Sequence, residues 1–302
     1  MFMRFCSARA FHAISVIALL FLTTGASARE NHAARENHGA EIDTEHLFGF
    51  TTGSDIGEKG EKEFESESNV RSGKGGGAYT AAFEQLEAKY TLAQNFRIAA
   101  AAVYAYHNIL DMPETDDRRR GEFQGLLADA RFRLLDRERS PVGLTVSVEP
   151  HWSRVDDITG VPVENYGGTV TLAIDKELVA KKLYAAVNLL YEPEVTHFRE
   201  TDVWMHQSTM GISGALAVRA ASGVFIGAEL RSLHLYDGLG LNSFTGRALF
   251  AGPTFYAKLS QHWWLSLAWN IQVRGHAADR PGSLDLTNYE HHRATARFGY
   301  HF

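Results

Sequence analysis

The feature that most constrains the fold is a period-two pattern of apolar and polar residues, which recurs from residue 60 to the end of the chain. Within 262–275, for example, Leu265 and Leu267 are separated by the polar Ser266. Such alternation places successive side chains on opposite faces of an extended backbone, so each repeat is predicted to be a β-strand with one apolar face. The pattern predicts strands near 60–72, 79–91, 96–108, 122–135, 142–154, 167–178, 183–196, 203–219, 224–236, 247–259, 262–275 and 291–302.

The connections between these segments alternate between short and long. "LAQN" (92–95) and "ASG" (221–223) are short, whereas 108–121 and 276–290 are long. Outer-membrane barrels sort their connections in this way, with short turns in the periplasm and longer loops outside. Lipid cannot hydrogen-bond an open sheet edge, so the sheet must close. We therefore predict an all-β fold, a closed antiparallel transmembrane β-barrel of about 12 strands with both termini periplasmic.

The N-terminus has the features of a secretory signal peptide. Arg4 and Arg9 precede an apolar run at 13–22, and small residues follow at 26–28. The only cysteine, Cys6, lies within this signal, so the mature chain is expected to contain no disulfide. Residues 1–28 are predicted to be removed during export through the periplasm to the cell outer membrane.

The next segment, 29–59, is polar, and the repeat "ARENHA" and "ARENHG" spans its start, at 28–33 and 34–39. It has no strand or helix periodicity, so we expect a flexible periplasmic leader before a barrel that covers 60–302. The strand count would change if 46–56 joined the sheet.

The net charge and the motifs of the chain limit the partners and cofactors that it can be expected to bind. The chain has a formal net charge of −6, which argues against binding nucleic acid. It contains no phosphate-binding glycine loop and no Cys/His zinc pattern, so no cofactor and no metal are expected. The expected partners are outer-membrane lipid, lipopolysaccharide and a small solute that the sequence does not identify.

The last strand carries aromatic residues on one face. Phe298, Tyr300 and Phe302 alternate with polar or small residues up to the terminal residue. This ending resembles the C-terminal signal by which outer-membrane barrels are handed to the barrel-assembly machinery. An aromatic girdle at the membrane interface is the alternative interpretation, and the two are compatible.

Two stretches carry a resemblance to a known family. In 46–104 a phenylalanine-glycine segment and a threonine pair precede a glycine-lysine turn and an acidic first strand, and 249–272 adds a glycine-proline strand and a tryptophan turn. These features resemble a family of uncharacterised Gram-negative outer-membrane barrels, labelled as outer-membrane transporters or domains of unknown function. The resemblance implies a barrel in the outer membrane and no particular substrate. The residues that carry it in the first stretch are Phe48, Gly49, Thr51, Thr52, Gly60, Glu63, Glu65 and Tyr90.

If the apolar faces of the strands meet lipid, their polar faces line the lumen. The charges there have two interpretations: ion pairs that fill the barrel, or the lining of a channel for a small polar or charged solute. The charged residues predicted to line the lumen are Glu63, Glu65, Glu67, Glu87, Lys89, Arg97, Asp129, Arg131, Arg133, Glu149, Asp175, Glu177, Glu192, Glu194, Glu229, Arg231, Arg274, Arg293 and Arg297.

One motif suggests catalysis. His206 and Ser208 share the face of the strand that also carries Met210 and Ile212, so they are expected on the lipid side. The pair resembles the His-x-Ser arrangement of outer-membrane phospholipase A, in which histidine acts as general base and serine as nucleophile. A passive channel or transporter is the main functional prediction. The alternatives are an acyl hydrolase that uses His206 and Ser208, and a non-conducting barrel that serves structure or surface binding.

Overall fold

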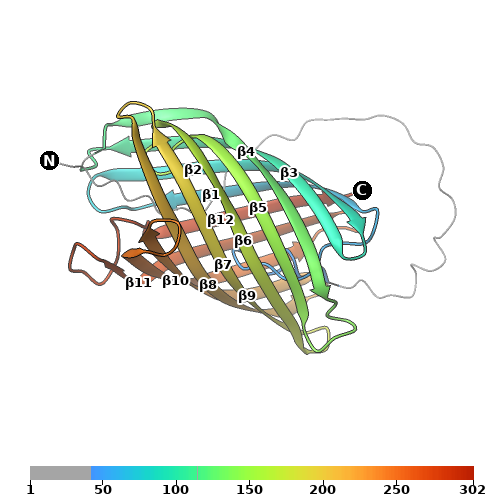
Figure 1. The fold of residues 1–302 in the computed structure, drawn as a ribbon. Coiled ribbons are helices and arrows are strands. Elements are labelled where there is room, and N and C mark those ends of the chain that lie inside the picture. The colour runs from blue at the N-terminus through green and yellow to red at the C-terminus, as the bar shows by residue number, and fades with distance from the viewer. Residues whose placement is uncertain (1–41, 114) are drawn as a thin grey trace.

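The computed structural model describes residues 42–113 and 115–302, and these form a closed antiparallel β-barrel (Figure 1). This confirms the predicted fold class and strand number. Among the described residues, no helix is long and apolar enough to span a membrane. The twelve strands are β1 (Lys62–Ser72), β2 (Ala78–Ala93), β3 (Phe96–Leu110), β4 (Arg118–Leu135), β5 (Gly143–Val155), β6 (Pro162–Val179), β7 (Leu183–Phe198), β8 (Val203–Ala221), β9 (Val224–Asp237), β10 (Ser243–Lys258), β11 (Trp263–Ala277) and β12 (His292–His301).

The barrel closes between its first and last strands. β1 pairs with β12 from Glu63 opposite His301 to Ser72 opposite His292, and every other strand pairs with its neighbours in sequence. All strands therefore have two partners and no sheet edge is left unpaired. We call the end where β1 begins and β12 stops the near end, and the opposite end the far end.

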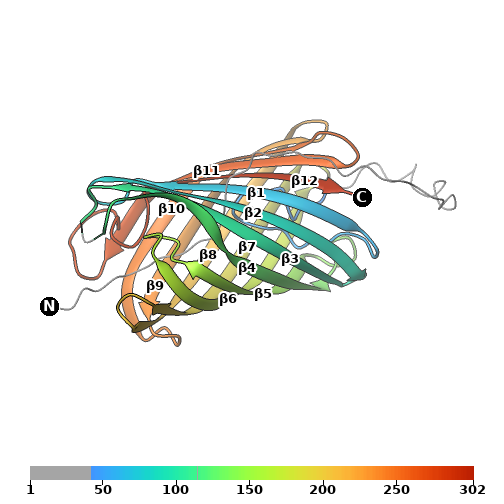
Figure 2. The same ribbon diagram turned by 90° about the horizontal axis from the view of Figure 1, so that it is seen from above.

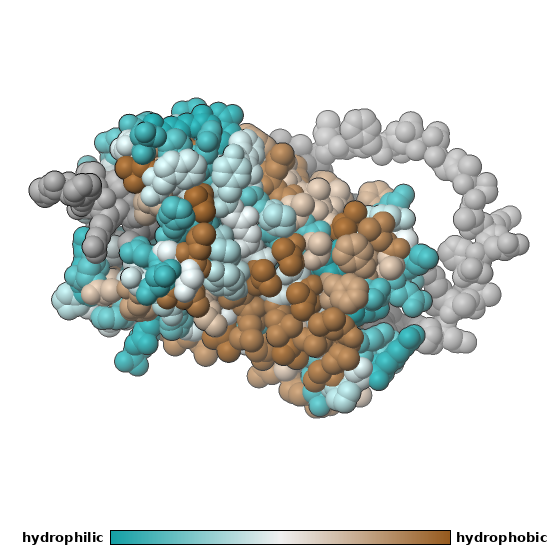
Figure 3. All heavy atoms as spheres, viewed as in Figure 1, coloured by the Kyte–Doolittle hydropathy of each residue, from teal (hydrophilic) through white to brown (hydrophobic). Residues whose placement is uncertain are grey.

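The outer wall of the barrel carries apolar side chains, whereas a soluble protein keeps most of its large apolar side chains in its interior. On β11 the side chains of Trp269 and Val273 are exposed by 50% and 52%, and similar residues recur on the other strands. Apolar side chains gather in a belt across the face drawn in Figure 3, with hydrophilic side chains towards both ends. Such a belt suits contact with lipid rather than water.

The connections are sorted by length less strictly than predicted. The turn between β4 and β5 at the near end spans 136–142, whereas the far-end connection between β7 and β8 spans only 199–202. Several strands run beyond their predicted far ends, and β6 begins at Pro162 instead of 167. At the far end, the strands stay hydrogen-bonded to their neighbours beyond the apolar belt. There the residues no longer alternate between apolar and polar, so the sequence pattern does not show where the strand ends.

The described part of the predicted leader is not a free segment. Residues 42–59, which we call the plug, run inside the barrel close to the near end and become exposed at Glu58 and Lys59, just before β1 (Figure 2). Leu47, Phe48 and Ile56 are at most 1% exposed. Leu47 and Phe48 belong to an apolar cluster with Phe225 and Trp264 of the barrel wall. The prediction of a flexible leader is wrong for 42–59, because these apolar residues gain burial inside the barrel; residues 1–41 are outside the described residues.

Two far-end connections also fold inwards. Asp157, in the connection 156–161, is fully buried, as are Tyr289 and Glu290 in the connection 278–291. Tyr289 packs against Phe250 with ring centroids 6.2 Å apart. The chain therefore occupies the lumen at both ends and leaves a polar region between them.

Candidate functional site

Most of the charged residues predicted to line the lumen are buried inside the barrel. Arg131, Arg133 and Glu149 are partly buried. Glu177 lies at the near-end mouth, where it is exposed and accepts a hydrogen bond from the Tyr184 hydroxyl. The buried members are Glu63, Glu65, Glu67, Glu87, Lys89, Arg97, Asp129, Asp175, Glu192, Glu194, Glu229, Arg231, Arg293 and Arg297.

Arg274 is the exception, because it lies on the outer wall. Leu249 pairs with Arg274, but the next residue, Phe250, pairs with Gln272, so Val273 is an extra residue in β11. Such a bulge reverses the alternation beyond it. The prediction that Arg274 lines the lumen is therefore wrong, since period-two counting cannot detect a bulge.

Glu45 of the plug is the centre of an ion-pair cluster in the lumen. Its carboxylate contacts Arg97, with Nη2 at 2.8 Å, and Nη1 of Arg131 at 2.9 Å. Nζ of Lys89 lies 3.4 Å away. Burial alone would raise the pKa of Glu45, but the three cations outweigh it and hold the pKa well below its usual value. One plug carboxylate thus joins three successive strands, β2, β3 and β4.

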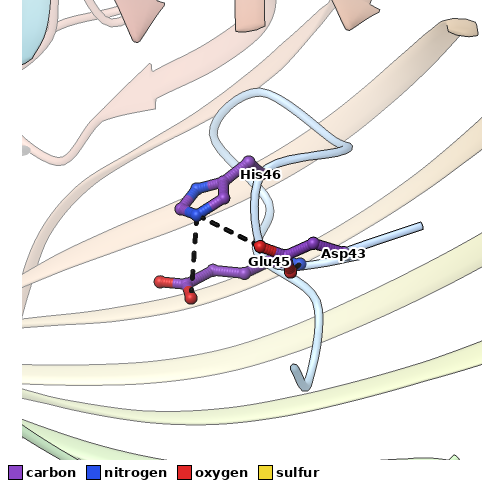
Figure 4. A group of neighbouring side chains, drawn as sticks. All are labelled: Asp43, Glu45 and His46. Atoms are coloured by element: carbon purple, nitrogen blue, oxygen red, sulfur yellow. Dashed lines mark hydrogen bonds and ion pairs between the residues drawn. The ribbon is translucent and has the colours of Figure 1, made fainter. Parts of the chain in front are cut away.

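His46 lies beside Glu45 and is held between an aromatic ring and carboxylates. Its ring stacks on Trp264 at a centroid distance of 3.8 Å, and Nε2 lies 3.1 Å from Glu63 and 3.4 Å from Asp43. Figure 4 shows His46, Asp43 and Glu45 converging inside the barrel. Burial acts to lower the pKa of His46, but the carboxylates of Glu63, Glu45 and Asp43 raise it above 6.5. The carboxylates around His46 therefore favour its protonated form.

Buried wall residues also hold the plug backbone. The Thr51 amide donates to Glu229 at 2.9 Å, and the Thr52 amide donates to Asn188 at 2.8 Å. The amide and hydroxyl of Ser54 donate to Asp175. Each of the three amide contacts gives a plug backbone N–H group a partner inside the barrel. The plug is thus fixed to β6, β7 and β9 on one side of the lumen and to β2–β4 on the other.

A glycine allows the plug to approach the wall. Gly49 has φ +74°, and a Cβ at this position would lie 2.5 Å from Cβ of Ala268 and 3.1 Å from Cγ2 of Thr254. Only glycine adopts this conformation without cost and also fits the space.

The far end is closed by a second ion-pair cluster. Nη1 of Arg71 lies 3.0 Å from Asp157 and 3.7 Å from Glu290, and Arg293 Nη2 lies 2.8 Å from Glu290. Burial raises the pKa of Glu290, but Arg293 and Arg71 outweigh it and lower the pKa to about 2. These contacts tie two inward-folded connections to β1 and β12.

A polar chamber of about 180 Å³ lies between these closures. That is space for a few waters or a small ion, not for a large solute. More carboxylates than cations surround it, so its lining has a modest acidic excess. The charged lining residues are Glu45, Glu65, Glu67, Glu87, Lys89, Arg97, Asp129, Arg131, Glu149, Glu192, Arg231 and Arg297.

Sequence reasoning missed Glu45 and His46 because it assigned them to a leader. The available signal was the apolar content of the plug: Leu47, Phe48 and Ile56 stand within a segment that otherwise looks like a linker. A solvated linker has no reason to carry such residues, so they indicate a packed segment.

The geometry does not support a His206–Ser208 hydrolase. Ser208 is fully buried, and its hydroxyl donates to the Gly238 carbonyl at 2.7 Å. It also accepts a hydrogen bond from the Leu241 amide at 3.4 Å. His206 is exposed. A nucleophilic serine needs a base at its hydroxyl, and here the hydroxyl is bonded to the backbone of a turn.

The sequence of the chain matches that of a known protein family. Residues 40–302 match the sequence model of DUF6662, a family of unknown function, so the chain belongs to it. This confirms the resemblance to an uncharacterised barrel family. No protein among the curated ones matches the chain.

Two solved structures show the same fold. The COG4313 outer membrane channel from Pseudomonas putida F1 is 10% identical, with a TM-score of 0.59 over 82% of this chain and 98% of that one. The beta domain of the Bordetella autotransporter BrkA is 13% identical, with a TM-score of 0.51 over 81% of this chain and 100% of that one. Both are similar to the present barrel in architecture.

Proposed function

We propose that this member of the DUF6662 family is an outer-membrane channel for small polar or charged solutes, held closed by its plug. The observation that carries the proposal is a charged chamber inside a closed barrel whose outer wall is apolar. Export through the periplasm, with both termini on the periplasmic side, is part of the proposal. The similar architecture of a Pseudomonas putida protein described as an outer membrane channel supports it.

The arrangement of charges also supports the proposal. Burying ionised groups costs more free energy than burying apolar residues of similar size. A barrel whose interior only had to be filled would therefore be more stable with apolar side chains there. The apolar clusters here lie towards the two ends, and the middle is charged. A charged middle attracts and solvates ions once the plug moves aside.

Single-channel recording of the refolded protein in a planar bilayer tests the proposal. Discrete current steps are expected, and the acidic excess of the chamber predicts a reversal potential that favours cations. Neutralising Arg131 and Arg133 together to glutamine should increase the cation preference. The paired control Arg139→Gln/Arg280→Gln removes two exposed charges from turns and should leave selectivity unchanged. Equal selectivity in all three proteins would contradict a pathway through the chamber.

A second candidate is a non-conducting barrel with a structural or surface-binding role. The observation that favours it is the filled lumen, which the plug and the connections 156–161 and 278–291 occupy. Deleting residues 42–56 from the mature chain separates the two. The channel proposal requires current steps of higher conductance from the deleted protein, whereas a folded barrel that stays silent after this deletion favours the second candidate.

A further inference from the structure

The outer wall carries a cationic depression at the far end of β9, β10 and β11. Its volume is about 250 Å³, and Arg247 and Arg274 line it together with His234 and Ser232. Arg247 is paired with His234 on one side and with His276 on the other. Arg274 lies diagonally across the same strand pair from Arg247, at a separation of about 7 Å between Cβ atoms. These groups are therefore neighbours on one face.

The bulge at Val273 forms this site. Without the extra residue, Arg274 would continue the inward face of β11 that includes Asn270 and Gln272, both at most 1% exposed. With it, Arg274 and His276 lie on the outer face and are exposed. A bulge commonly redirects a side chain at a functional position.

The height of the depression matches a membrane interface. The outward side chains of β11 are apolar from Trp263 to Val273. With about 3.4 Å per residue and a strand tilt of about 40°, these residues cover about 25 Å, the height of the apolar band of an outer-membrane barrel. Arg274 follows directly after this band. The two guanidinium groups therefore lie where the apolar part of the wall gives way to the headgroup region.

The surrounding side chains also suit an interface. The Phe244 ring lies 6.4 Å from His234, 5.9 Å from Tyr236 and 6.3 Å from His276. Aromatic rings concentrate at headgroup level, where one end of the ring is apolar and the other is wet.

No protein carboxylate within the described residues neutralises the two arginines. The lining of the depression contains no Asp or Glu, and neither Arg247 nor Arg274 has an ion pair to a carboxylate in the described part of the chain. By contrast, two other exposed arginines at the far end do have carboxylate partners: Arg120 lies 3.3 Å from Glu122, and Arg199 lies 2.7 Å from Glu164. Two adjacent guanidinium groups over an open depression present a fork of donors that fits a phosphate.

We propose that this depression binds the phosphate of a lipid headgroup in the leaflet that it faces. The inference rests on the membrane placement proposed above but not on conduction. With the far end outside, the leaflet is the outer one and the lipid is the phosphorylated glycolipid of lipopolysaccharide. Arg247 and Arg274 hold the phosphate, His234 and His276 flank it, and the apolar wall below receives the acyl chains.

The test is a binding titration of diphosphorylated lipid A to the purified full chain in detergent, read by native mass spectrometry. Each cation near a phosphate surface contributes about 1 kcal/mol, so the Arg247→Gln/Arg274→Gln variant should bind about 30-fold more weakly. Heat-modifiable gel mobility shows whether the variant barrel is folded. The two single variants, each about 5-fold weaker, provide the same test if the double variant fails to fold.

The matched control is Arg119→Gln/Arg120→Gln on β4, because these arginines lie at the same end and already have partners in Tyr106 and Glu122. It should bind lipid A as the wild type does, and dephosphorylated lipid A should not distinguish the wild type from the Arg247/Arg274 variant. Unchanged affinity in that variant, or an equal loss in the control, would overturn the proposal. Displacement of lipid A by millimolar inorganic phosphate would also overturn it, since the site would then bind free anions without a lipid.

Discussion

Replacing Glu45 by glutamine tests whether the plug closes the barrel. Glu45 accepts charged hydrogen bonds from Arg97 at 2.8 Å and contacts Arg131 at 2.9 Å. The amide of glutamine keeps the shape but removes the charge, so cations on three strands lose their shared partner. We expect the plug to leave the lumen more often, and the channel to open more often.

The size of the effect follows from the contacts that remain. Arg97 keeps Asp129 at 3.6 Å, and Lys89 keeps Glu63 at 3.3 Å, so part of the interaction survives. Removing one partner from a buried ion pair costs about 3–5 kcal/mol, and the lower value suits a cluster with these remaining partners. About 3 kcal/mol changes the ratio of plugged to unplugged states roughly 100-fold.

Open probability in single-channel recordings is the measurement, with Glu138→Gln as the control because Glu138 is exposed on a near-end turn. Glu45→Gln should increase open probability by about two orders of magnitude at unchanged unit conductance, and the control should match the wild type. An unchanged open probability in a folded Glu45→Gln barrel would show that this cluster does not hold the channel closed.

Three further results are expected. First, because the pKa of His46 is raised, its positive charge stabilises the docked plug fully below pH 6.5, and this stabilisation is lost as the pH rises through the raised pKa. The open probability of the channel should therefore rise with pH above 6.5. A His46→Gln barrel that keeps the same pH profile as the wild type would contradict this. Second, Gly49→Ala should loosen the plug by about 1–3 kcal/mol, because the new Cβ meets Ala268 at a positive φ; faster protease cleavage within 42–59, with the barrel itself resistant, measures it. Third, removing Phe302 should lower the yield of folded barrel in cells if the aromatic C-terminus is read by the assembly machinery, whereas an equal yield would favour a role at the membrane interface alone.

The sequence predicted the barrel because its signal is local and repeated. A strand between water and lipid must alternate along its whole length, so twelve weak patterns support each other. The plug escaped prediction because its fold depends on long-range contacts, such as Thr51 with Glu229, that leave no periodicity. Arg274 was assigned to the wrong face because one bulged residue reverses every position after it. The lumen charges were predictable as a set, but the partner that joins three of them, Glu45, was not.

Because Glu45 belongs to the plug, the lumen of the open state differs from that of the closed state in its charge as well as in its free volume. When the plug leaves, Lys89, Arg97 and Arg131 line the pathway without the carboxylate that they share in the closed state. His46 also lines the chamber and leaves with Glu45, so at a pH at which His46 is neutral the acidic excess of the chamber falls by one charge. Three cations then face the solute near the near end. An open channel should therefore be less cation-selective than the closed chamber suggests. This also gives the plug a way to return, because a mobile segment that carries Glu45 is attracted to the cations that its departure exposes.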